Sequence, residues 1–488
     1  MERLNARLFD APRRPVKVLQ YGEGNFLRAF VDYMLDIANE KAGFDGGVAL
    51  VKPIPMGSLQ SFHEQDGRYT VLLRGLEDGH PVEKTRLVTC VSDAVDAYAQ
   101  YDRYAAYARD PNLRFVVSNT TEAGIVLDET DRLELCPPNT YPGKLCKLLY
   151  ERAQAFDYAP DKGLIMLPVE LIDDNGAALK RCVKALACLW KLGSRFEEWL
   201  EEACVFASTL VDRIVTGYPR DEAEALWRRL GYEDRLLVTG EPFALWVIES
   251  DRDISSELPL AQCGLPVIFT DNQKPYKQRK VRILNGAHTS FVPAAFLCGH
   301  DFVLDAMKDS LIRGFMEGVI YDEVIPTLSL PREDLLSFAQ AVTGRFMNPY
   351  IKHALLSICL NCVSKWRARC MPSLLQYVQD HGALPKRLAF SLAAMMALYR
   401  GGSLGDGVLT CRRDGQPYTL MDDASVLAFF AAHANADART LTKRFLSDET
   451  FFGQDLTQVP GLEAYVGDAL ESVERLGMRQ ALTERFGG

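Results

Sequence analysis

The chain has 488 residues, of which 48% are hydrophobic, 25% charged and 10% aromatic, a composition that indicates a globular protein large enough for two or three domains. Its formal charge of −10, from 55 basic and 65 acidic residues without a dense basic run, argues against nucleic acid or an anionic membrane as the main partner. No apolar run approaches the ~20 residues that span a bilayer, and the first residues lack the apolar core of a secretory signal, so we expect a cytoplasmic protein.

Five short runs rich in β-branched and apolar residues predict β-strands in the first half of the chain. They are VKVLQY (16–21), GGVALV (46–51), RLVTCV (86–91), RFVVSN (114–119) and GLIMLPV (163–169). The segment after the first run places Phe26, Phe30 and Met34 about four residues apart, which indicates a half-buried helix. This alternation of strands and helices predicts an α/β fold with a largely parallel sheet.

From about residue 275 onward the chain is typical of successive amphipathic helices, interrupted by one expected hairpin at 408–420. Asp271, Asn272 and Pro275 supply turn and helix-start residues between the two halves. We therefore predict two domains, residues 1–273 and residues 274–488, of which the second is mostly α-helical.

A glycine turn, YGEGNFLRAF, follows the first predicted strand. Gly22 permits a tight turn, and Gly24 lets the backbone approach a pyrophosphate at the start of the helix that begins near Asn25 and Phe26. The third glycine of the dinucleotide fingerprint is absent, because Leu27 stands in its place. A similar turn without a nucleotide is common, so both interpretations stay open for these residues alone.

The end of the second predicted strand leaves the choice of cofactor open. A NAD site would present an acid there to the ribose 2′-hydroxyl, but Lys52 and Pro53 follow the strand directly. A lysine could instead approach the 2′-phosphate of NADP.

The stretch KQRKVRILNGAH (277–288) carries a second candidate site. At about 100° per residue of an α-helix, Asn285 lies roughly 140° and His288 roughly 80° round from Lys280, so the three share one face. The positive helix end and the nearby cations would lower the pKa of Lys280 toward neutrality, which suits a general acid/base. Asn285 and His288 would then hold the substrate oxygen. The simpler alternative is a solvated lysine beside two side chains that satisfy loop carbonyls.

The chain has 12 cysteines, and three of them cluster near a histidine. Cys359, Cys362 and Cys370 follow His353, but the first two lie in a run typical of a helix with apolar neighbours on both sides. We interpret them as thiols of the core rather than as zinc ligands.

Several motifs in the same order resemble those of the long-chain polyol-specific dehydrogenases, the mannitol dehydrogenase family. They are K-x4-N-x2-H at 280–288, V-D-R-I at 211–214 and T-E-x-G in SNTTEAGI at 118–125, and the similarity runs through nearly the whole chain. The resemblance implies an N-terminal Rossmann-type domain, a mostly α-helical C-terminal domain, and an active site in the cleft between them. It also implies NAD(H) as cofactor, no catalytic metal, and Lys280 as a general acid/base assisted by Asn285 and His288.

By the same resemblance, Asp212 and Arg345 contact the substrate, while Asn119 and Glu122 lie at the cofactor. Simpler roles remain open for each group. Asp212 and the adjacent Arg213 could join the two domains, Arg345 could be a turn arginine, and Glu122 could cap a helix.

Two departures from the family pattern point to the substrate. Glu170 and Leu171 stand where the mannitol-type enzymes carry Asp-Asn, with Asn175 as the nearest replacement amide, and Lys277 stands where they carry an acid. Losing an acid and gaining a cation fits a substrate with a carboxylate. Within the family the similarity is greatest to uronate reductases, and this resemblance implies the reversible, NADH-dependent reduction of D-tagaturonate, a uronate, to its aldonate, D-altronate, in hexuronate catabolism. The alternatives are fructuronate, a neutral ketose, or a nucleotide-binding protein without catalysis, and the sequence does not determine the oligomeric state.

Overall fold

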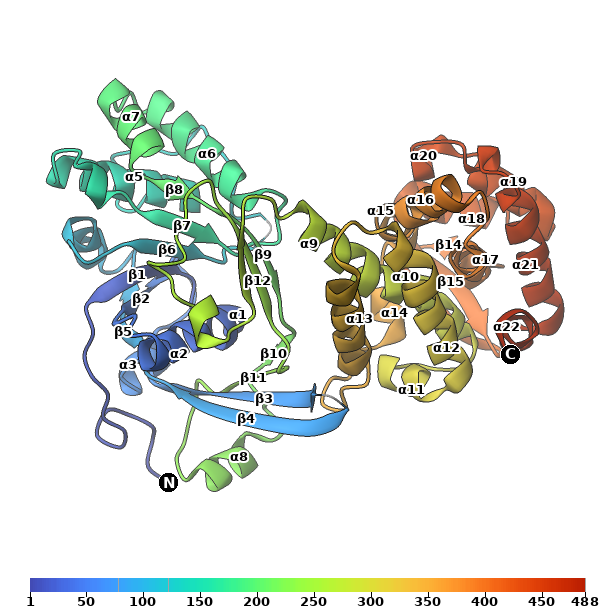
Figure 1. Ribbon diagram of the computed structural model, residues 1–488, viewed down its shortest axis with the longest axis horizontal. Coiled ribbons are helices and arrows are strands. Elements are labelled where there is room, and N and C mark those ends of the chain that lie inside the picture. The colour runs from blue at the N-terminus through green and yellow to red at the C-terminus, as the bar shows by residue number, and fades with distance from the viewer. Residues whose placement is uncertain (78, 122, 488) are drawn as a thin grey trace. The chain divides into compact units, whose positions relative to one another are not determined.

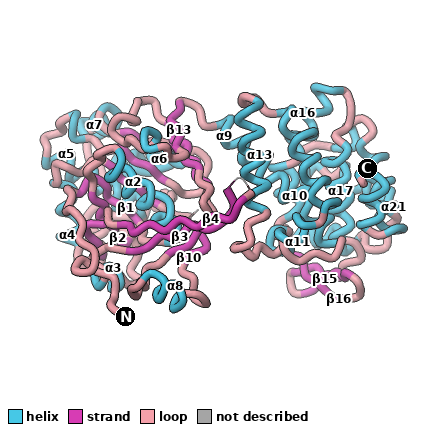
Figure 2. Tube along the Cα trace, turned by 60° about the horizontal axis from the view of Figure 1, so that its bottom comes forward, coloured by secondary structure: helices cyan, strands magenta, loops and turns pink. Residues whose placement is uncertain are grey.

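The protein is described by a computed structural model that covers residues 1–77, 79–121 and 123–487 (Figure 1). The chain forms two compact units, one of residues 1–75 and 81–273, the other of residues 76–80 and those from 274 onward. Strands gather in the first unit, whereas the second is helical apart from one small sheet (Figure 2). These features confirm the predicted fold class, an α/β unit followed by a mostly helical unit.

Six parallel strands form the main sheet of the first unit, in the order β5-β2-β1-β6-β7-β8. Their bounds are β1 (Val16–Tyr21), β2 (Gly47–Lys52), β5 (Val91–Asp96), β6 (Phe115–Ser118), β7 (Ile165–Pro168) and β8 (Val205–Phe206). This is the strand order of the doubly wound dinucleotide-binding sheet, in which the direction of winding reverses between β1 and β6. Ligands of such sheets bind at the carboxyl ends of the strands on either side of that reversal.

Both faces of this sheet are buried, because successive side chains of a strand point to opposite faces. Val18 and Leu50 join one core cluster, whereas Leu19 and Val51 join the other. Helices complete the second cluster, whereas helices and strands of two smaller sheets complete the first. These elements are labelled in Figure 1. The α- and π-helices of this unit are α1 (Asn25–Leu27), the π-helix η1 (Arg28–Asp32), α2 (Tyr33–Lys41), α3 (Gln60–Glu64), α4 (Tyr101–Ala105), α5 (Tyr141–Ala155), α6 (Asn175–Leu189), α7 (Ser194–Glu202) and α8 (Ala223–Leu230).

Two smaller sheets were not foreseen from the sequence. Their strands are β10 (Val215–Gly217), β11 (Val238–Gly240), β3 (Tyr69–Glu77) and β4 (His80–Val88) in one, and β13 (Val267–Thr270), β12 (Leu245–Glu249) and β9 (Ser208–Asp212) in the other. The single strand predicted at 86–91 is wrong, since β4 ends at Val88 and β5 begins at Val91. The break arises because the amide and hydroxyl of Thr89 both donate to Asp36 Oδ1, at 2.8 and 3.2 Å, instead of continuing a ladder.

The second unit is built around α10 and α17, whose side chains are almost all buried, as expected for helices that are apolar all round. Its main helices are α9 (Lys274–Arg279), the π-helix η5 (Lys280–Asn285), α10 (Gly286–Leu297), α11 (Val303–Lys308), α12 (Ser310–Gly318), the π-helix η6 (Val319–Val324), α13 (Arg332–Phe346), α14 (Leu355–Ile358), α15 (Cys362–Arg369), α16 (Met371–His381), α17 (Lys386–Tyr399), α18 (Ala424–Ala432), α19 (Ala438–Leu446), α20 (Glu449–Phe452), α21 (Leu462–Leu476) and α22 (Met478–Phe486). The predicted hairpin is confirmed as β15 (Val408–Arg413) and β16 (Gln416–Leu420), with β14 (Ser403–Gly405) added at its edge.

Cys359, Cys362 and Cys370 are buried free thiols. The helix expected around the first two is interrupted, because Asn361 adopts the left-handed conformation with φ of 52° and starts a new helix.

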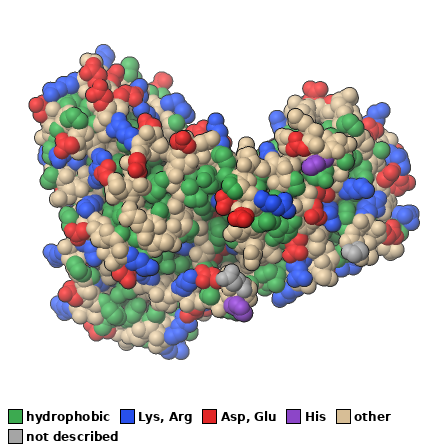
Figure 3. Space-filling view, in the orientation of Figure 1, with side chains coloured by type: hydrophobic (Ala, Val, Ile, Leu, Met, Phe, Trp, Pro, Cys, Tyr) green, Lys and Arg blue, Asp and Glu red, His purple; other side chains and the backbone are tan. Residues whose placement is uncertain are grey.

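Acidic and basic side chains are interspersed over the face shown in Figure 3. Within the described ranges, no helix combines the length and the apolar character that crossing a membrane requires.

Candidate active site

The glycine turn after β1 forms a cradle at the carboxyl end of the sheet. Gly22 has φ of +119°, and a Cβ there would lie 3.1 Å from Leu27 Cδ1 and 3.3 Å from the carbonyl oxygen of Asn119, so only glycine fits without strain. A Cβ at Gly24, by contrast, would meet no protein atom within 4 Å. The turn therefore leaves open space at the start of the helical segment 25–41, where a pyrophosphate fits.

The two residues that follow the turn have different surroundings. Asn25 is exposed, and its Oδ1 accepts a hydrogen bond of 2.6 Å from Arg28 Nη2. Phe26 stacks on Phe30 with ring centroids 4.9 Å apart. Leu27, which replaces the third glycine of the fingerprint, is buried and packs against Gly22 of the turn.

Glu170 organises the segment at the end of β6 and was not foreseen as a site residue. This carboxylate is only 2% exposed, and it accepts hydrogen bonds from Ser118 Oγ at 3.1 Å, from the Thr120 amide at 2.9 Å and from Thr120 Oγ1 at 2.8 Å. Burial raises the pKa of Glu170, and these hydrogen bonds oppose the rise. Between the two bonded residues, the Asn119 amide donates to the carbonyl of Tyr21 at 3.2 Å, which places Asn119 beside the glycine turn. Glu122 lies outside the described residues.

Asn175 does not replace the missing oxyanion amide. The side chain is fully buried, and its Oδ1 accepts from the amides of Gly176 and Thr209 at 2.9 and 2.8 Å. Its Nδ2 donates to the carbonyls of Pro168, Glu170 and Thr209, at 3.0, 3.0 and 3.1 Å. This amide is therefore committed to the backbone around β7 and β9.

The ammonium of Lys52 is also bound within the protein, which contradicts the idea that it approaches a 2′-phosphate. It is 3% exposed, and its Nζ lies 2.8 Å from Asp96 Oδ2. The same nitrogen donates to the carbonyls of Pro55, Met56 and Gly57, at 3.0, 3.4 and 3.4 Å.

Asp212 is buried at the end of β9, and its neighbour Arg213 holds the first unit together internally. The Arg213 guanidinium donates to the carbonyls of Ala29, Pro242 and Phe243, at 2.6, 3.1 and 3.0 Å. Burial lowers the pKa of Arg213 to about 10. These contacts join η1 to the loop before β12, so Arg213 acts within one unit rather than between two.

The prediction that Lys280, Asn285 and His288 lie on one α-helix is wrong. Lys280 and Asn285 are the first and last residues of the π-helix η5, which leads into α10 at Gly286. Because a π-helix bonds residue i to residue i+5, Lys280 and Asn285 lie about one turn apart on the same side, closer than an α-helix would place them. Single π-turns inside helices occur frequently at functional sites. Lys277 lies one turn earlier, on α9.

His288 lies in the first turn of α10 against two aromatic rings. It stacks on Phe346 with centroids 4.2 Å apart and meets His353 edge-on at 5.3 Å. Burial lowers the pKa of His288 well below 6.5, and the charges of His353, Arg345, Arg369 and Lys365 lower it further. The imidazole is therefore neutral near pH 7. Its Nε2 is buried and has no hydrogen-bond partner in the described part of the chain, as expected of a group that faces a ligand.

The charges of three cations lower the pKa of this imidazole. Arg345 lies in the last turn of α13 and is 8% exposed, while Lys365 and Arg369 lie on α15. Lys365 Nζ donates to the Ile358 carbonyl at 3.1 Å, and Arg369 Nη1 donates to Thr289 Oγ1 at 3.3 Å. Across the ranges that the structure describes, Lys365 and Arg369 form no ion pair. Sequence reasoning missed both, because nothing in their spacing shows that α15 packs against α10.

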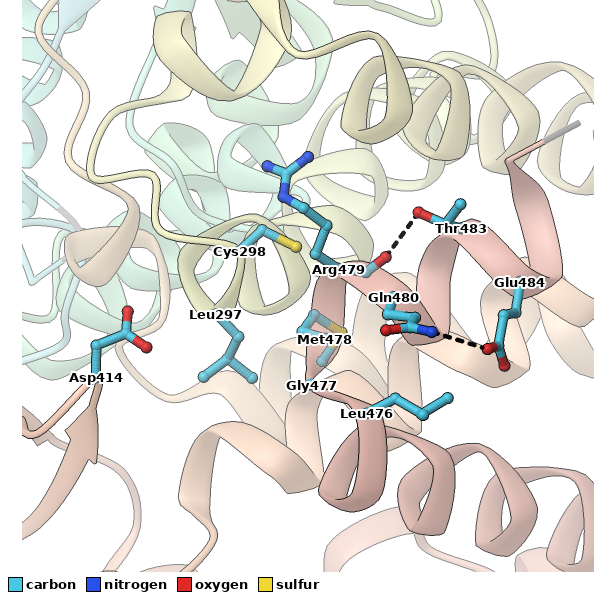
Figure 4. Close-up of a pocket in the computed structure, with 10 residues that line it drawn as sticks. All are labelled: Leu297, Cys298, Asp414, Leu476, Gly477, Met478, Arg479, Gln480, Thr483 and Glu484. Atoms are coloured by element: carbon cyan, nitrogen blue, oxygen red, sulfur yellow. Dashed lines mark hydrogen bonds between the residues drawn. The ribbon is translucent and has the colours of Figure 1, made fainter.

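Other features of the two units lie apart from these residues. A hollow of about 580 Å³ in the second unit is lined by α22 and neighbouring turns, including Cys298, Arg479 and Glu484, and contains none of the predicted site residues (Figure 4). No group of three or more His, Cys, Asp or Glu residues able to hold a metal occurs among residues 1–77, 79–121 and 123–487.

The doubly wound sheet, with an open glycine turn at its point of reversal, is typical of the Rossmann class of dinucleotide-binding proteins. Residues 16–261 match the mannitol dehydrogenase Rossmann domain, and residues 272–474 match the mannitol dehydrogenase C-terminal domain. The chain therefore belongs to the mannitol dehydrogenase family. As a member of a dehydrogenase family, it is an oxidoreductase that acts on CH–OH groups.

Curated relatives and solved structures match the whole length of the chain. It is 47% identical to the altronate oxidoreductase of Yersinia enterocolitica and 48% identical to that of Pectobacterium atrosepticum, each over 99% of both chains. A substrate-free D-sorbitol dehydrogenase has a TM-score of 0.80 at 22% identity, over 98% of this chain and 100% of its own. Mannitol 2-dehydrogenase of Pseudomonas fluorescens, solved with NAD and D-mannitol, has a TM-score of 0.68 at 24% identity, over 99% of both chains. The two structures agree with the fold described above.

Proposed function

We propose that the protein catalyses the reversible reduction of D-tagaturonate to D-altronate with NADH. The observation that carries the proposal is the unpartnered Nε2 of a neutral His288, which lies among cations in the segment that also bears Lys280 and Asn285. The similarity to altronate oxidoreductases over the full chain supports the same substrate.

Lys280 is the proposed proton donor to the ketone oxygen, and it takes the proton back in the reverse direction. NADH, when bound, supplies the hydride. A neutral imidazole cannot serve as the acid, so His288 is assigned, with Asn285, to hold the oxygen as it gains negative charge. Lys280 is the remaining side chain of the three that carries a transferable proton at neutral pH. The proposal assigns no step to a metal ion.

The carboxylate of the substrate is assigned to the cations around His288. Arg345, Lys365 and Arg369 present positive charge near that imidazole, and Lys277 lies one turn before Lys280. Arg369 donates to Thr289 Oγ1 at 3.3 Å, and this hydroxyl donates to the Asn285 carbonyl at 3.0 Å, so the guanidinium lies near the helical turn that begins at Asn285. A uronate carries its ketone and its carboxylate near opposite ends of a short chain, which suits this arrangement. A neutral hexitol has no carboxylate for Lys365 and Arg369 to bind.

The nucleotide is assigned to the cradle at the end of β1. Gly22 and Gly24 shape the turn, Asn25 and Phe26 begin the helical segment behind it, and Asn119 lies at its edge. The helix start favours the pyrophosphate, because its free amides and its dipole attract an anion.

The decisive assay offers purified protein NADH with D-tagaturonate, D-fructuronate or D-fructose and follows the loss of NADH. We expect the highest kcat/KM on tagaturonate. Preference for fructuronate would instead identify a sister reductase, and activity on fructose alone would refute a uronate substrate.

A pair of lysine variants tests the assignment of the acid/base. K280M should lower kcat by about 100- to 10,000-fold while NADH binding persists, because only proton transfer is removed. K274M, at the exposed start of α9, is the matched control and should leave turnover unchanged. Turnover retained in K280M would overturn the role of Lys280.

A pair of arginine variants on α15 tests the carboxylate site. R369Q should raise KM for the uronate by about 10- to 100-fold with a smaller change in kcat, because a charge-assisted contact made in the ground state is lost. R367Q, on the exposed side of the same helix, should leave KM unchanged. Equal KM in both variants would remove Arg369 from the substrate site.

A further inference from the structure

The acid that usually distinguishes NAD from NADP at the end of the second strand is absent, since β2 ends in Lys52. Lys52 itself is occupied, because its ammonium pairs with Asp96 and donates to three carbonyls of the segment 55–57. The residue that separates the two cofactors therefore lies elsewhere at this edge of the sheet.

Glu23 stands at the centre of the glycine turn, between Gly22 and Gly24, and is half-buried. A Cβ on Gly57 would lie 3.9 Å both from Glu23 Oε1 and from Lys52 Cδ, so the carboxylate faces the loop that follows β2. Within the described residues, Glu23 forms no ion pair. Its carboxylate thus lies where the end of β1 meets the end of β2, the position at which the adenosine ribose binds in sheets of this order.

We infer that Glu23 selects NAD(H) over NADP(H), by accepting a hydrogen bond from the adenosine ribose and by repelling a 2′-phosphate. The inference rests on the nucleotide site proposed above. In other NAD sites an acid at the end of the second strand binds the ribose, and here Glu23 of the glycine turn takes that role.

The charges at this edge favour the same outcome. Lys52 and Asp96 neutralise each other at 2.8 Å, which leaves Glu23 as the uncompensated charge of the three. Burial raises the pKa of Glu23, but the nearby charges of Lys52 and Arg28 oppose the rise and favour the ionised form. A 2′-phosphate would bring further negative charge to a carboxylate that forms no ion pair within the described residues.

The loop that follows β2 adds an apolar surface beside this carboxylate. Ile54 and Met56 are 50% and 74% exposed, although both are large hydrophobic side chains. The carbonyl bonds to Lys52 hold the loop that presents them. Side chains of this kind suit contact with the flat face of an adenine, so the ribose would lie between them and the glycine turn.

The test measures binding to the full-length protein without any sugar substrate, so it does not depend on whether tagaturonate is the substrate. Dissociation constants of NADH and NADPH are measured by fluorescence titration, and those of 5′-AMP and adenosine 2′,5′-bisphosphate by calorimetry. The variants are E23Q, K52M, and E198Q as a matched loss of one carboxylate from the exposed face of α7.

We expect the wild type to bind NADH more tightly than NADPH, and 5′-AMP more tightly than the bisphosphate. E23Q should reduce both ratios by about tenfold, E198Q should leave them unchanged, and K52M should weaken all four ligands alike because it releases the loop. The inference is overturned if the ratios of E23Q equal those of E198Q, if the wild type prefers NADPH, or if K52M weakens only the ligands that carry a 2′-phosphate.

Discussion

Replacing Glu170 by Ala removes the acceptor of three hydrogen bonds from the segment 118–120. The two hydroxyls can rotate toward other acceptors, at a loss of about 1 kcal/mol each, but the Thr120 amide cannot, and an unsatisfied buried donor costs about 1–3 kcal/mol. Removing a carboxylate whose burial raises its pKa offsets part of this loss. We therefore expect E170A to lower the free energy of unfolding by about 2 kcal/mol.

Urea titration and thermal unfolding measure this change, and the Tm of E170A should fall by about 5 °C. NADH titration should show binding about tenfold weaker, because the loosened segment that carries Asn119 must become ordered when the nucleotide binds.

E170Q is the matched control for this prediction. Its Oε1 can still accept from Thr120, and its Nε2 can donate to Ser118 Oγ, so stability and NADH affinity should stay close to those of the wild type. The reasoning fails if E170A unfolds and binds NADH like the wild type. It also fails if E170Q loses as much as E170A, because charge rather than hydrogen-bond geometry would then be the cause.

Three further predictions concern buried groups and the glycine turn. Burial raises the pKa of Asp32 to about 7 from an ordinary 3.8, so the folded wild type loses stability as the pH rises through this range. Between pH 4 and pH 8, the free energy of unfolding of D32N should rise by about 4 kcal/mol relative to that of the wild type, as measured by urea titration. A difference between the two proteins that does not change with pH would contradict this. Because the pKa of His288 lies well below 6.5, the wild type should lose stability as the pH falls below 6.5, and H288N should lose less, which unfolding midpoints at pH 7.5 and pH 5 would show. G22A should be destabilised by about 1–2 kcal/mol, because the φ of +119° at this position strains any side chain. G24A should fold normally but bind NADH more weakly, because its methyl group enters the open space of the turn. Equal thermal stability of the two variants would refute this difference.

The apolar runs predicted most of the main sheet because strands buried on both faces have little choice of composition. The prediction of one strand at 86–91 was wrong because of a tertiary contact. The Thr89 amide donates to Asp36 on α2 instead of forming a hydrogen bond between strands. The two smaller sheets escaped prediction because several of their strands have only three to five residues, too few to show a period.

The candidate site divides in the same way. Lys280, Asn285 and His288 were predicted as site residues from their spacing together with the resemblance to a family motif, whereas the π-helix that brings the first two closer together could not be predicted from the sequence. Lys52 was a plausible phosphate ligand until its contacts with Asp96 and the loop after β2 were known.

The sequence by itself determined the α/β and helical halves, the glycine turn and the candidate catalytic segment, because each depends on residues close together in the chain. Only the tertiary structure decided that Glu170 holds the 118–120 segment, that the side chains of Asn175 and Lys52 bond to the backbone, and that the charges of cations on α13 and α15 act on His288. Those roles depend on burial and on partners far away in sequence, and both arise only when the chain is folded.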